Sequence, residues 1–197
     1  MNKTSLSIRA LHADRDRAIA GVLAAALLDD PLASFACPDP GPRAVWLPSS
    51  FLGFLTMGHA QGEVIGAGDP LSGVAIARRV QDQPEADTSL TETMHPLDER
   101  LFRQIEAAES RLHAASSGPH WFLDVIGVLP EYQGQGIGSS LIQNVIAQAE
   151  NDKLPVLLVT WQPRNLAFYR KHGFEVACEG DGPELGPHRW GFVRPSP

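Results

Sequence analysis

One continuous segment, residues 121–151, restricts the fold more than any other part of the chain. Residues 121–128 are almost all apolar and predict a buried strand, while apolar residues at helical spacing predict a helix from about 138 to 151. Between them three glycines stand at alternate positions, Gly134, Gly136 and Gly138. A strand that passes through a Gly-rich turn directly into a helix is typical of α/β proteins, so we predict a mixed α/β fold.

The turn has the composition of an anion-binding loop. Glycines let successive backbone N–H groups converge on one ligand, and the N-terminus of the following helix adds about half a positive charge. Phosphate or pyrophosphate is therefore the expected ligand. The turn is not a Walker loop, because no Lys precedes Ser139, and Ser139 also stands where a dinucleotide-binding fingerprint starting at Gly134 needs its last glycine. A Gly-rich turn without a ligand is the remaining alternative.

The other segments predict one α/β domain over residues 1–197. Predicted strands cover residues 6–10, 63–65, 74–77, 156–161, 174–178 and 189–193. Predicted helices cover about 14–28, 45–57, 97–115 and 165–172. Residues 37–42 and 81–96 are expected to be loops, and Asp30 with Pro31 is expected to end the first helix.

Composition and charge argue against several classes of function. Lys and Arg number 16 against 23 Asp and Glu, and the resulting net charge of −7 argues against broad binding to nucleic acid or anionic membranes. The longest apolar run, residues 19–28, is only about half a membrane span and follows acidic residues, unlike a signal peptide. Cys37 and Cys178 are too few for a disulfide framework. We therefore expect a cytoplasmic protein, a monomer or a homodimer, that binds neither nucleic acid nor membranes.

Two spaced motifs resemble the GNAT superfamily of N-acetyltransferases. The first, Val-x-Pro-x-x-Gln/Arg-Gly-x-Gly-x-Gly/Ala, is filled at Val128, Pro130, Gln133, Gly134, Gly136 and Gly138. The second, Asn-x-x-x-Tyr-x-x-x-Gly-Phe, is filled at Asn165, Tyr169, Gly173 and Phe174. Segments 120–123, 163–169 and 186–190 resemble most closely the puromycin N-acetyltransferase type. The resemblance implies a mostly antiparallel central sheet, splayed at its middle strands, with helices on both faces.

The resemblance covers about residues 119–194. It also implies that the two halves of the chain bind different substrates. Residues 119–194 would bind acetyl-CoA, and residues 1–118 would form the acceptor side, with the pocket built by the helices between Asp16 and Met57 and by the loop 81–96. The implied reaction is direct attack of a primary amine, expected to belong to a small molecule, on the thioester, with no metal. The residues implied to hold the cofactor are Ile126, Gly127, Val128, Gln133, Gly134, Gln135, Gly136, Ile137, Gly138, Ser139 and Asn165.

Tyr169 matches the family tyrosine that protonates the departing CoA thiolate. A helix tyrosine packed on the sheet is the alternative. Asn165 is expected to bond the pantetheine arm, to cap the following helix, or both.

The general base does not follow directly from the resemblance, because Thr160 occupies the position where many relatives have Glu. Strand alternation would place His120, Phe122, Asp124 and Ile126 on one face, so Asp124 would be an acid within an apolar strand, where burial raises its pKa. We predict Asp124 as the base, directly or through water, and His120 as the second candidate. A structural carboxylate, a contact to the substrate ammonium, or a reaction without a dedicated base are the alternatives for Asp124.

Two further hypotheses remain open from the sequence. A basic cluster, Arg164, Arg170, Lys171 and His172, lies next to the second motif and would either meet the 3′-phosphate of CoA or form a solvated helix face. The chain as a whole would be either an enzyme or a non-catalytic acyl-CoA sensor on the same fold. Thr160 favours the sensor slightly, whereas Tyr169 and the intact Gly-rich turn favour the enzyme.

Overall fold

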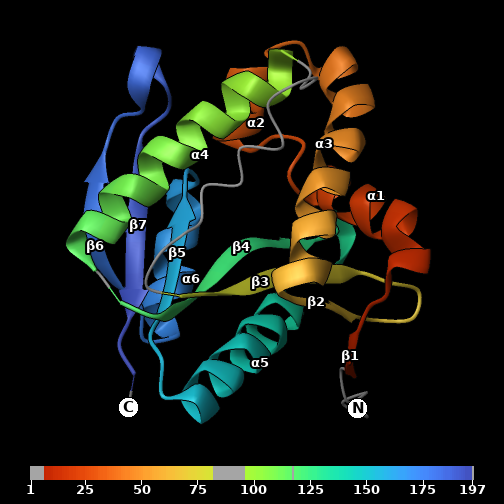
Figure 1. The fold of residues 1–197 in the computed structure, drawn as a ribbon. Helices are drawn as coiled ribbons and strands as arrows, with labels where there is room; N and C mark the ends of the chain where they lie inside the picture. Colours follow the sequence, from red (N-terminus) through yellow and green to blue (C-terminus); the bar gives the residue numbers. More distant parts are fainter. Residues whose placement is uncertain (1–6, 82–95, 117, 197) are drawn as a thin grey trace.

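The structure is a computed structural model that describes residues 7–81, 96–116 and 118–196 (Figure 1). Its strands are β1 (Ile8–Ala10), β2 (Gly62–Ala67), β3 (Gly73–Val80), β4 (His120–Val128), β5 (Val156–Thr160), β6 (Glu175–Gly180) and β7 (Arg189–Arg194). Its helices are α1 (Asp16–Ala26), α2 (Pro31–Ala36), α3 (Pro40–Gln61), α4 (Pro96–Ala115), α5 (Ile137–Asp152) and α6 (Leu166–Lys171). One sheet unites the strands in the order β1-β2-β3-β4-β5-β7-β6, so strands from both halves of the chain belong to it.

The predicted fold class, including the splay, is confirmed. All neighbouring strands pair antiparallel except β4 and β5, which are parallel. These two strands pair only where Trp121, Phe122 and Leu123 face Val156, Leu157 and Leu158. Beyond that point β4 and β5 diverge, as Figure 1 shows, and the second half of β4 has a strand partner on one side only.

A β-bulge at the start of the divergence changes the faces of β4. Val125 pairs with Ile76 of β3 and Leu123 pairs with Ala77, which leaves Asp124 as the extra residue. The predicted alternation that placed Ile126 on the face of Phe122 and Asp124 is therefore wrong. Val125 packs with α1 and α3, whereas Ile126 and Val128 pack on the side of α5. The bulge depends on the register with β3, which the sequence of β4 alone does not contain.

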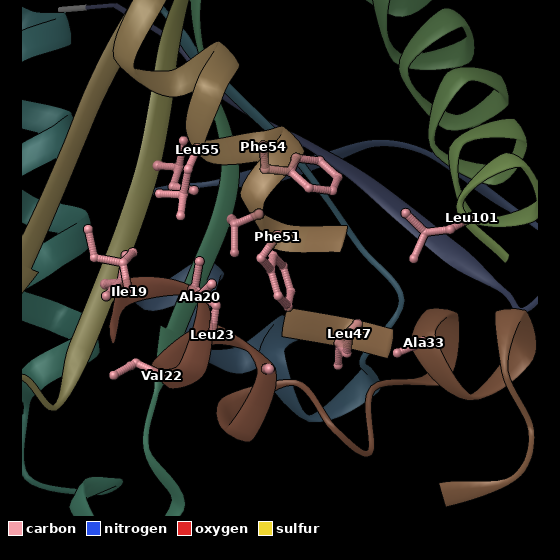
Figure 2. Packing of buried hydrophobic residues seen from close by; sticks show 14 of the residues in the cluster. Ile19, Ala20, Val22, Leu23, Ala33, Leu47, Phe51, Phe54, Leu55 and Leu101 are labelled. Carbon is pink, nitrogen blue, oxygen red and sulfur yellow. The ribbon is translucent and has the colours of Figure 1, made fainter. Parts of the chain in front are cut away.

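Helices cover both faces of the sheet. Buried residues of α1, α2, α3 and α4 form one cluster with Val64, Val74, Ile76 and Val125 on one face. Figure 2 shows part of it, with Leu47, Phe51 and Phe54 on α3, Leu23 on α1, Ala33 on α2 and Leu101 on α4. The other face carries α5, whose apolar stripe packs against Ala75, Ala77 and Leu123. Strands β2, β3 and β4 thus have apolar contacts on both faces of the sheet.

Two predictions for the first half need correction. Asp30 and Pro31 do not merely end a helix: Asp30 caps a further helix, α2, by accepting a hydrogen bond from the Leu32 amide at 2.9 Å. The expected loop at 37–42 is shorter, because Asp39 caps α3 in the same way and α3 begins at Pro40 rather than near Val45. Pro48 lies inside α3. Most of the expected loop 81–96 lies outside the described residues.

Within the described part of the chain, no helix combines the length and the apolarity needed to cross a membrane.

Candidate active site

A cavity of about 460 Å³ lies at the Gly-rich turn. Every residue predicted to hold the cofactor lies on its wall except Gln135. The Gln135 side chain instead donates a hydrogen bond to the carbonyl oxygen of Glu131, at 3.2 Å, on the outside of the turn. The wall also includes residues of α6 and the second half of β4. This half of β4 has no strand partner on the side of β5.

The turn reaches its shape through two glycines in the left-handed region. Gly134 has φ of 74° and Gly136 has φ of 86°, conformations that a residue with a Cβ adopts only with strain. Gly136 is also the N-cap of α5 and provides no side-chain cap, so the first amides of α5 have no protein side chain bonded to them at that position. The first turn of α5 therefore lies at the cavity wall without a side-chain cap from its N-cap residue, an arrangement that suits an anion.

A second cavity, of about 120 Å³, lies on the other side of a shared wall. The residues common to the two cavities are Leu27, Asp30, Ile126, Asn165 and Tyr169. Its remaining lining is mostly apolar and comes from α2, α3 and α4 together with the diverging ends of β4 and β5. The predicted contribution of the helices between Asp16 and Met57 is consistent with this lining. Residues 1–118 do not line this cavity alone, because β4 and β5 also contribute to it.

Tyr169 stands in the shared wall and is 4% exposed. Its ring contacts those of Phe168, Phe174 and Phe192. Burial, reinforced by the negative charge of Asp30, raises the pKa of Tyr169 above its ordinary value. The phenol is therefore neutral at physiological pH and has a proton to donate.

Asp124 lies in the wall of the smaller cavity, with a side chain that is only 3% exposed. Its Oδ1 accepts a hydrogen bond from Nε of Arg78 at 2.8 Å, and Nη2 of the same arginine donates to both carboxylate oxygens of Glu109 at 3.1 Å. Oδ2 of Asp124 is buried without a partner. Burial raises the pKa of Asp124 to about 7, although Arg78 opposes the shift. A carboxyl that titrates near neutrality with one free oxygen has the properties of a general base.

Asp30 is a second acidic group of the site that the sequence interpretation missed. It lies in the shared wall, and burial raises its pKa to about 6 against the opposing effects of the Leu32 and Ala33 amides and of Arg164. The signal for Asp30 was present in the sequence, because Asp followed by Pro is the start of a capped helix as well as the end of the previous one.

Glu109 was missed for a different reason. It follows Leu101 and Ile105 at intervals of four, so it interrupts the apolar stripe of α4, a position at which a carboxylate needs a partner. Its partner, Arg78, is on β3 and has no signal of its own in the sequence.

His120 does not lie on the wall of either cavity. Its Nδ1 is 2.7 Å from the carbonyl oxygen of Gly118, and its Nε2 is 3.1 Å from Nε2 of His113. Burial lowers its pKa. Both ring nitrogens are thus engaged at the start of β4, four residues before Asp124 in the strand, and the structure does not bring the two predicted bases together.

The basic cluster divides between the cavity and the surface. Arg164 and Lys171 line the larger cavity, whereas Arg170 and His172 are absent from its lining. Nε2 of His172 lies 3.1 Å from the hydroxyl of Ser139, at the first turn of α5. Among the described residues, no group of three or more His, Cys, Asp or Glu side chains is arranged to hold a metal ion.

Comparisons with known proteins agree with this geometry. Residues 46–174 match the model of the acetyltransferase (GNAT) family. Among curated proteins, the bovine (Bos taurus) thialysine N-epsilon-acetyltransferase is 36% identical over 69 residues, which cover 33% of this chain and 40% of the bovine protein. The chain spans less than half the length of the curated relatives it matches.

Solved structures are similar over nearly the full length. A histone acetyltransferase HPA2-related protein from Corynebacterium glutamicum has a TM-score of 0.71 and 21% identity, covering 98% of both chains. Arylalkylamine N-acetyltransferase 2 from Aedes aegypti has a TM-score of 0.73 and 14% identity, covering 96% of this chain and 98% of the mosquito protein. At these identities the likeness is one of fold.

Proposed function

Since this chain belongs to the acetyltransferase (GNAT) family, we propose that it is an N-acetyltransferase that transfers the acetyl group of acetyl-CoA to the primary amine of a small molecule. The observation that carries the proposal is the shared wall between the two cavities. One cavity has the Gly-rich turn and basic residues that suit a CoA pyrophosphate, and the other has apolar walls and carboxylates that suit an amine. Tyr169 stands between them.

The donor would lie along the larger cavity. Backbone amides at the start of α5 and the helix dipole would hold the pyrophosphate, as the family resemblance implies. The unpaired side of β4 at Ile126 and Val128 would bond the pantetheine arm in the manner of an added strand. A backbone N–H of the same strand would polarise the thioester carbonyl and stabilise the oxyanion that forms during attack.

The reaction would proceed in one transfer without an acyl-enzyme. The amine lone pair attacks the thioester carbon, the C–S bond breaks, and the Tyr169 hydroxyl gives its proton to the departing thiolate. The proton lost by the nitrogen passes to Asp124, directly or through water. Asp124 is preferred to Asp30 because Oδ2 of Asp124 is buried without a partner, whereas the Asp30 carboxylate is the N-cap of α2 and is engaged by the Leu32 and Ala33 amides. Asp30 would instead contribute negative charge that attracts the substrate ammonium.

Two finer assignments belong to the proposal. A relation to the puromycin N-acetyltransferase type rests on the sequence segments of the second half alone, and it concerns the donor side of the site rather than the identity of the acceptor. A cytoplasmic location agrees with the supply of acetyl-CoA there and with the free thiols of Cys37 and Cys178.

The test is release of CoA thiol from acetyl-CoA across a panel of primary amines, for the wild-type chain and for Tyr169→Phe. We expect amine-dependent release by the wild type and a fall in kcat of about 100-fold for the variant, because proton donation is lost. Thermal stabilisation by acetyl-CoA should be the same for both, since only the hydroxyl is removed. Stabilisation by acetyl-CoA without thiol release for any amine would refute the proposed activity.

A further inference from the structure

Three of the side chains that carry unpartnered buried polar atoms line the smaller cavity. Across the residues that the structure describes, buried side-chain atoms without a hydrogen-bond partner are Arg43 Nε, Ser50 Oγ, Gln104 Oε1, Asp124 Oδ2 and Trp161 Nε1. Ser50, Asp124 and Trp161 all line this cavity. A buried polar atom is unfavourable unless something bonds it, so three such side chains around one cavity favour a ligand with matching groups.

The three atoms differ in what they accept and donate. The indole N–H of Trp161 can only donate, and it therefore needs an acceptor such as a carbonyl, ether or phenol oxygen. The hydroxyl of Ser50 can donate or accept. Oδ2 of Asp124 accepts from an ammonium or amine. One ligand that carries an amine and an oxygen would satisfy the donor and the acceptor together.

The size and polarity of the cavity restrict the rest of the ligand. Its volume is about 120 Å³, and Leu47, Phe51, Phe54 and Leu101 are among its walls (Figure 2). An apolar cavity of about 150 Å³ accepts one benzene ring. The space therefore suits a single ring or a branched chain of similar size, and it is too small for the body of an aminonucleoside.

Charge restricts the acceptor to one ammonium group. The acidic residues of the lining are Asp30, Glu109 and Asp124. Both carboxylate oxygens of Glu109 are bonded to Arg78, which also donates to Oδ1 of Asp124, so these two carboxylates share one guanidinium. Asp30 and Oδ2 of Asp124 remain for the reacting amine, and the apolar part of the described lining provides no carboxylate for a second cation.

We propose that the acceptor is a monocationic primary amine with a compact apolar body, one ring or its equivalent, that bears an oxygen accepting from Nε1 of Trp161. The inference rests on the proposed function and names the substrate class of the same site. Trp161 and Ser50 are its specificity-determining residues, and neither takes part in the transfer itself.

The experiment compares kcat/KM for 2-phenylethylamine, its 4-hydroxy and 4-methoxy derivatives, 1,4-diaminobutane and puromycin. We expect the oxygen-bearing ring amines to exceed the unsubstituted amine by about 10- to 100-fold, because the analogue without oxygen leaves a buried donor unpaired. The diamine and puromycin are expected to be the poorest acceptors.

Variants separate specificity from folding. Trp161→Phe should reduce the ratio of kcat/KM between the oxygen-bearing ring amines and 2-phenylethylamine to about twofold, because the indole N–H is lost. Activity with 2-phenylethylamine should be retained, because the apolar surface is kept. Ser50→Ala gives a second, smaller reduction and serves if Trp161→Phe does not fold. Trp190→Phe is the matched control, since Trp190 lies outside the lining of both cavities.

The outcomes are distinguishable. Preference for the diamine or puromycin, or an unchanged oxygen preference in both Trp161→Phe and Ser50→Ala, would overturn the inference while leaving the acetyltransferase proposal intact. An unchanged oxygen preference in both variants would mean that ordered water, not substrate, bonds the three polar atoms. Absence of thiol release with every amine would instead reject the proposed function on which the inference depends.

Discussion

Arg78 determines which oxygen of Asp124 has no partner. Its Nε occupies Oδ1 at 2.8 Å and its Nη2 holds Glu109, while the guanidinium carbon lies 5.0 Å from the ring centre of Phe122. The arginine is thus fixed on three sides. A carboxylate held through one oxygen keeps a constant orientation, so its other oxygen can accept a proton without a change of rotamer.

The pH dependence of the reaction follows from the same residue. Only the ionised carboxylate accepts a proton, and burial raises the pKa of Asp124 to about 7, so kcat/KM should rise with pH through that value. Asp124→Asn should lower kcat/KM by about 100-fold and leave only the ionisation of the free amine in the pH profile. Asp181→Asn, at an exposed aspartate, is the control. A variant that keeps the wild-type profile between pH 5 and 9 would remove Asp124 from the role of base.

Whereas kcat/KM is expected to rise with pH, the ionisation of Asp30 is expected to lower the free energy of unfolding as pH rises. Its pKa is raised from 3.8 to about 6 in the folded protein, so folding favours its protonated form, and its contribution to stability is lost as pH rises from about 4 through 6. Asp30→Asn keeps a helix cap and removes this loss. We expect the variant to gain about 1 kcal/mol over the wild type between pH 5 and pH 8, measured by urea unfolding. An equal difference at both pH values would mean that burial does not perturb Asp30.

At the scale of elements, the connection from β4 to α5 is the most specialised part of the chain. Gly134 and Gly136 adopt positive φ, whereas Gly138 lies in the first turn of α5, where a Cβ would meet Phe168 at an ordinary 3.6 Å. The three glycines of the motif therefore have different requirements. The alternate spacing in the sequence does not reveal this difference.

Substitution by alanine separates these requirements. Gly136→Ala should lower the free energy of unfolding by about 1 kcal/mol, because the left-handed conformation is strained for a residue with a Cβ. Gly138→Ala should leave it unchanged or raise it slightly, since alanine favours the helix. Chemical denaturation of both variants provides the measurement. Equal destabilisation by the two would contradict the assigned backbone conformations.

The sequence was informative where structure is decided locally. The strand, turn and helix at 121–151, the stripe of α4 and the short helix α6 follow from periodicity and glycine placement, and the structure contains all of them. The bulge at Asp124 could not be predicted, because it arises from the register with β3. The helix α2 is not predicted, because Asp30 and Pro31 also form an end signal for the preceding helix, although the same pair starts α2.

For the whole molecule, net charge and cofactor binding need to be considered together. The chain carries −7, yet the proposed donor is a polyanion. The larger cavity resolves the conflict locally, since backbone amides of α5 and two cations, Arg164 and Lys171, lie on its wall. The candidate site could be predicted for the donor half, where the motifs are contiguous. The acceptor half could not, because Ser50, Arg78, Glu109 and Trp161 come from four separate elements or their ends.

Charge removal tests the two cations of the cavity. Arg164→Gln and Lys171→Gln should each raise the Kd for acetyl-CoA about two- to fivefold, since each removes one solvent-screened attraction to a phosphate. Arg170→Gln, in the same helix as Lys171 but outside the lining, should leave the Kd unchanged. Isothermal titration at two salt concentrations measures both the affinities and their screening. A larger effect of Arg170→Gln than of Lys171→Gln would place the phosphates elsewhere.

The divergence of β4 from β5 has a consequence beyond catalysis. A sheet is ordinarily open to further strands only at its two edge strands, but here β4 and β5 also have unpaired edges in the middle of the sheet. Exposed strand edges can pair with strands of other molecules and lead to aggregation. We therefore expect the ligand-free chain to self-associate more readily than the chain with the proposed donor bound along β4.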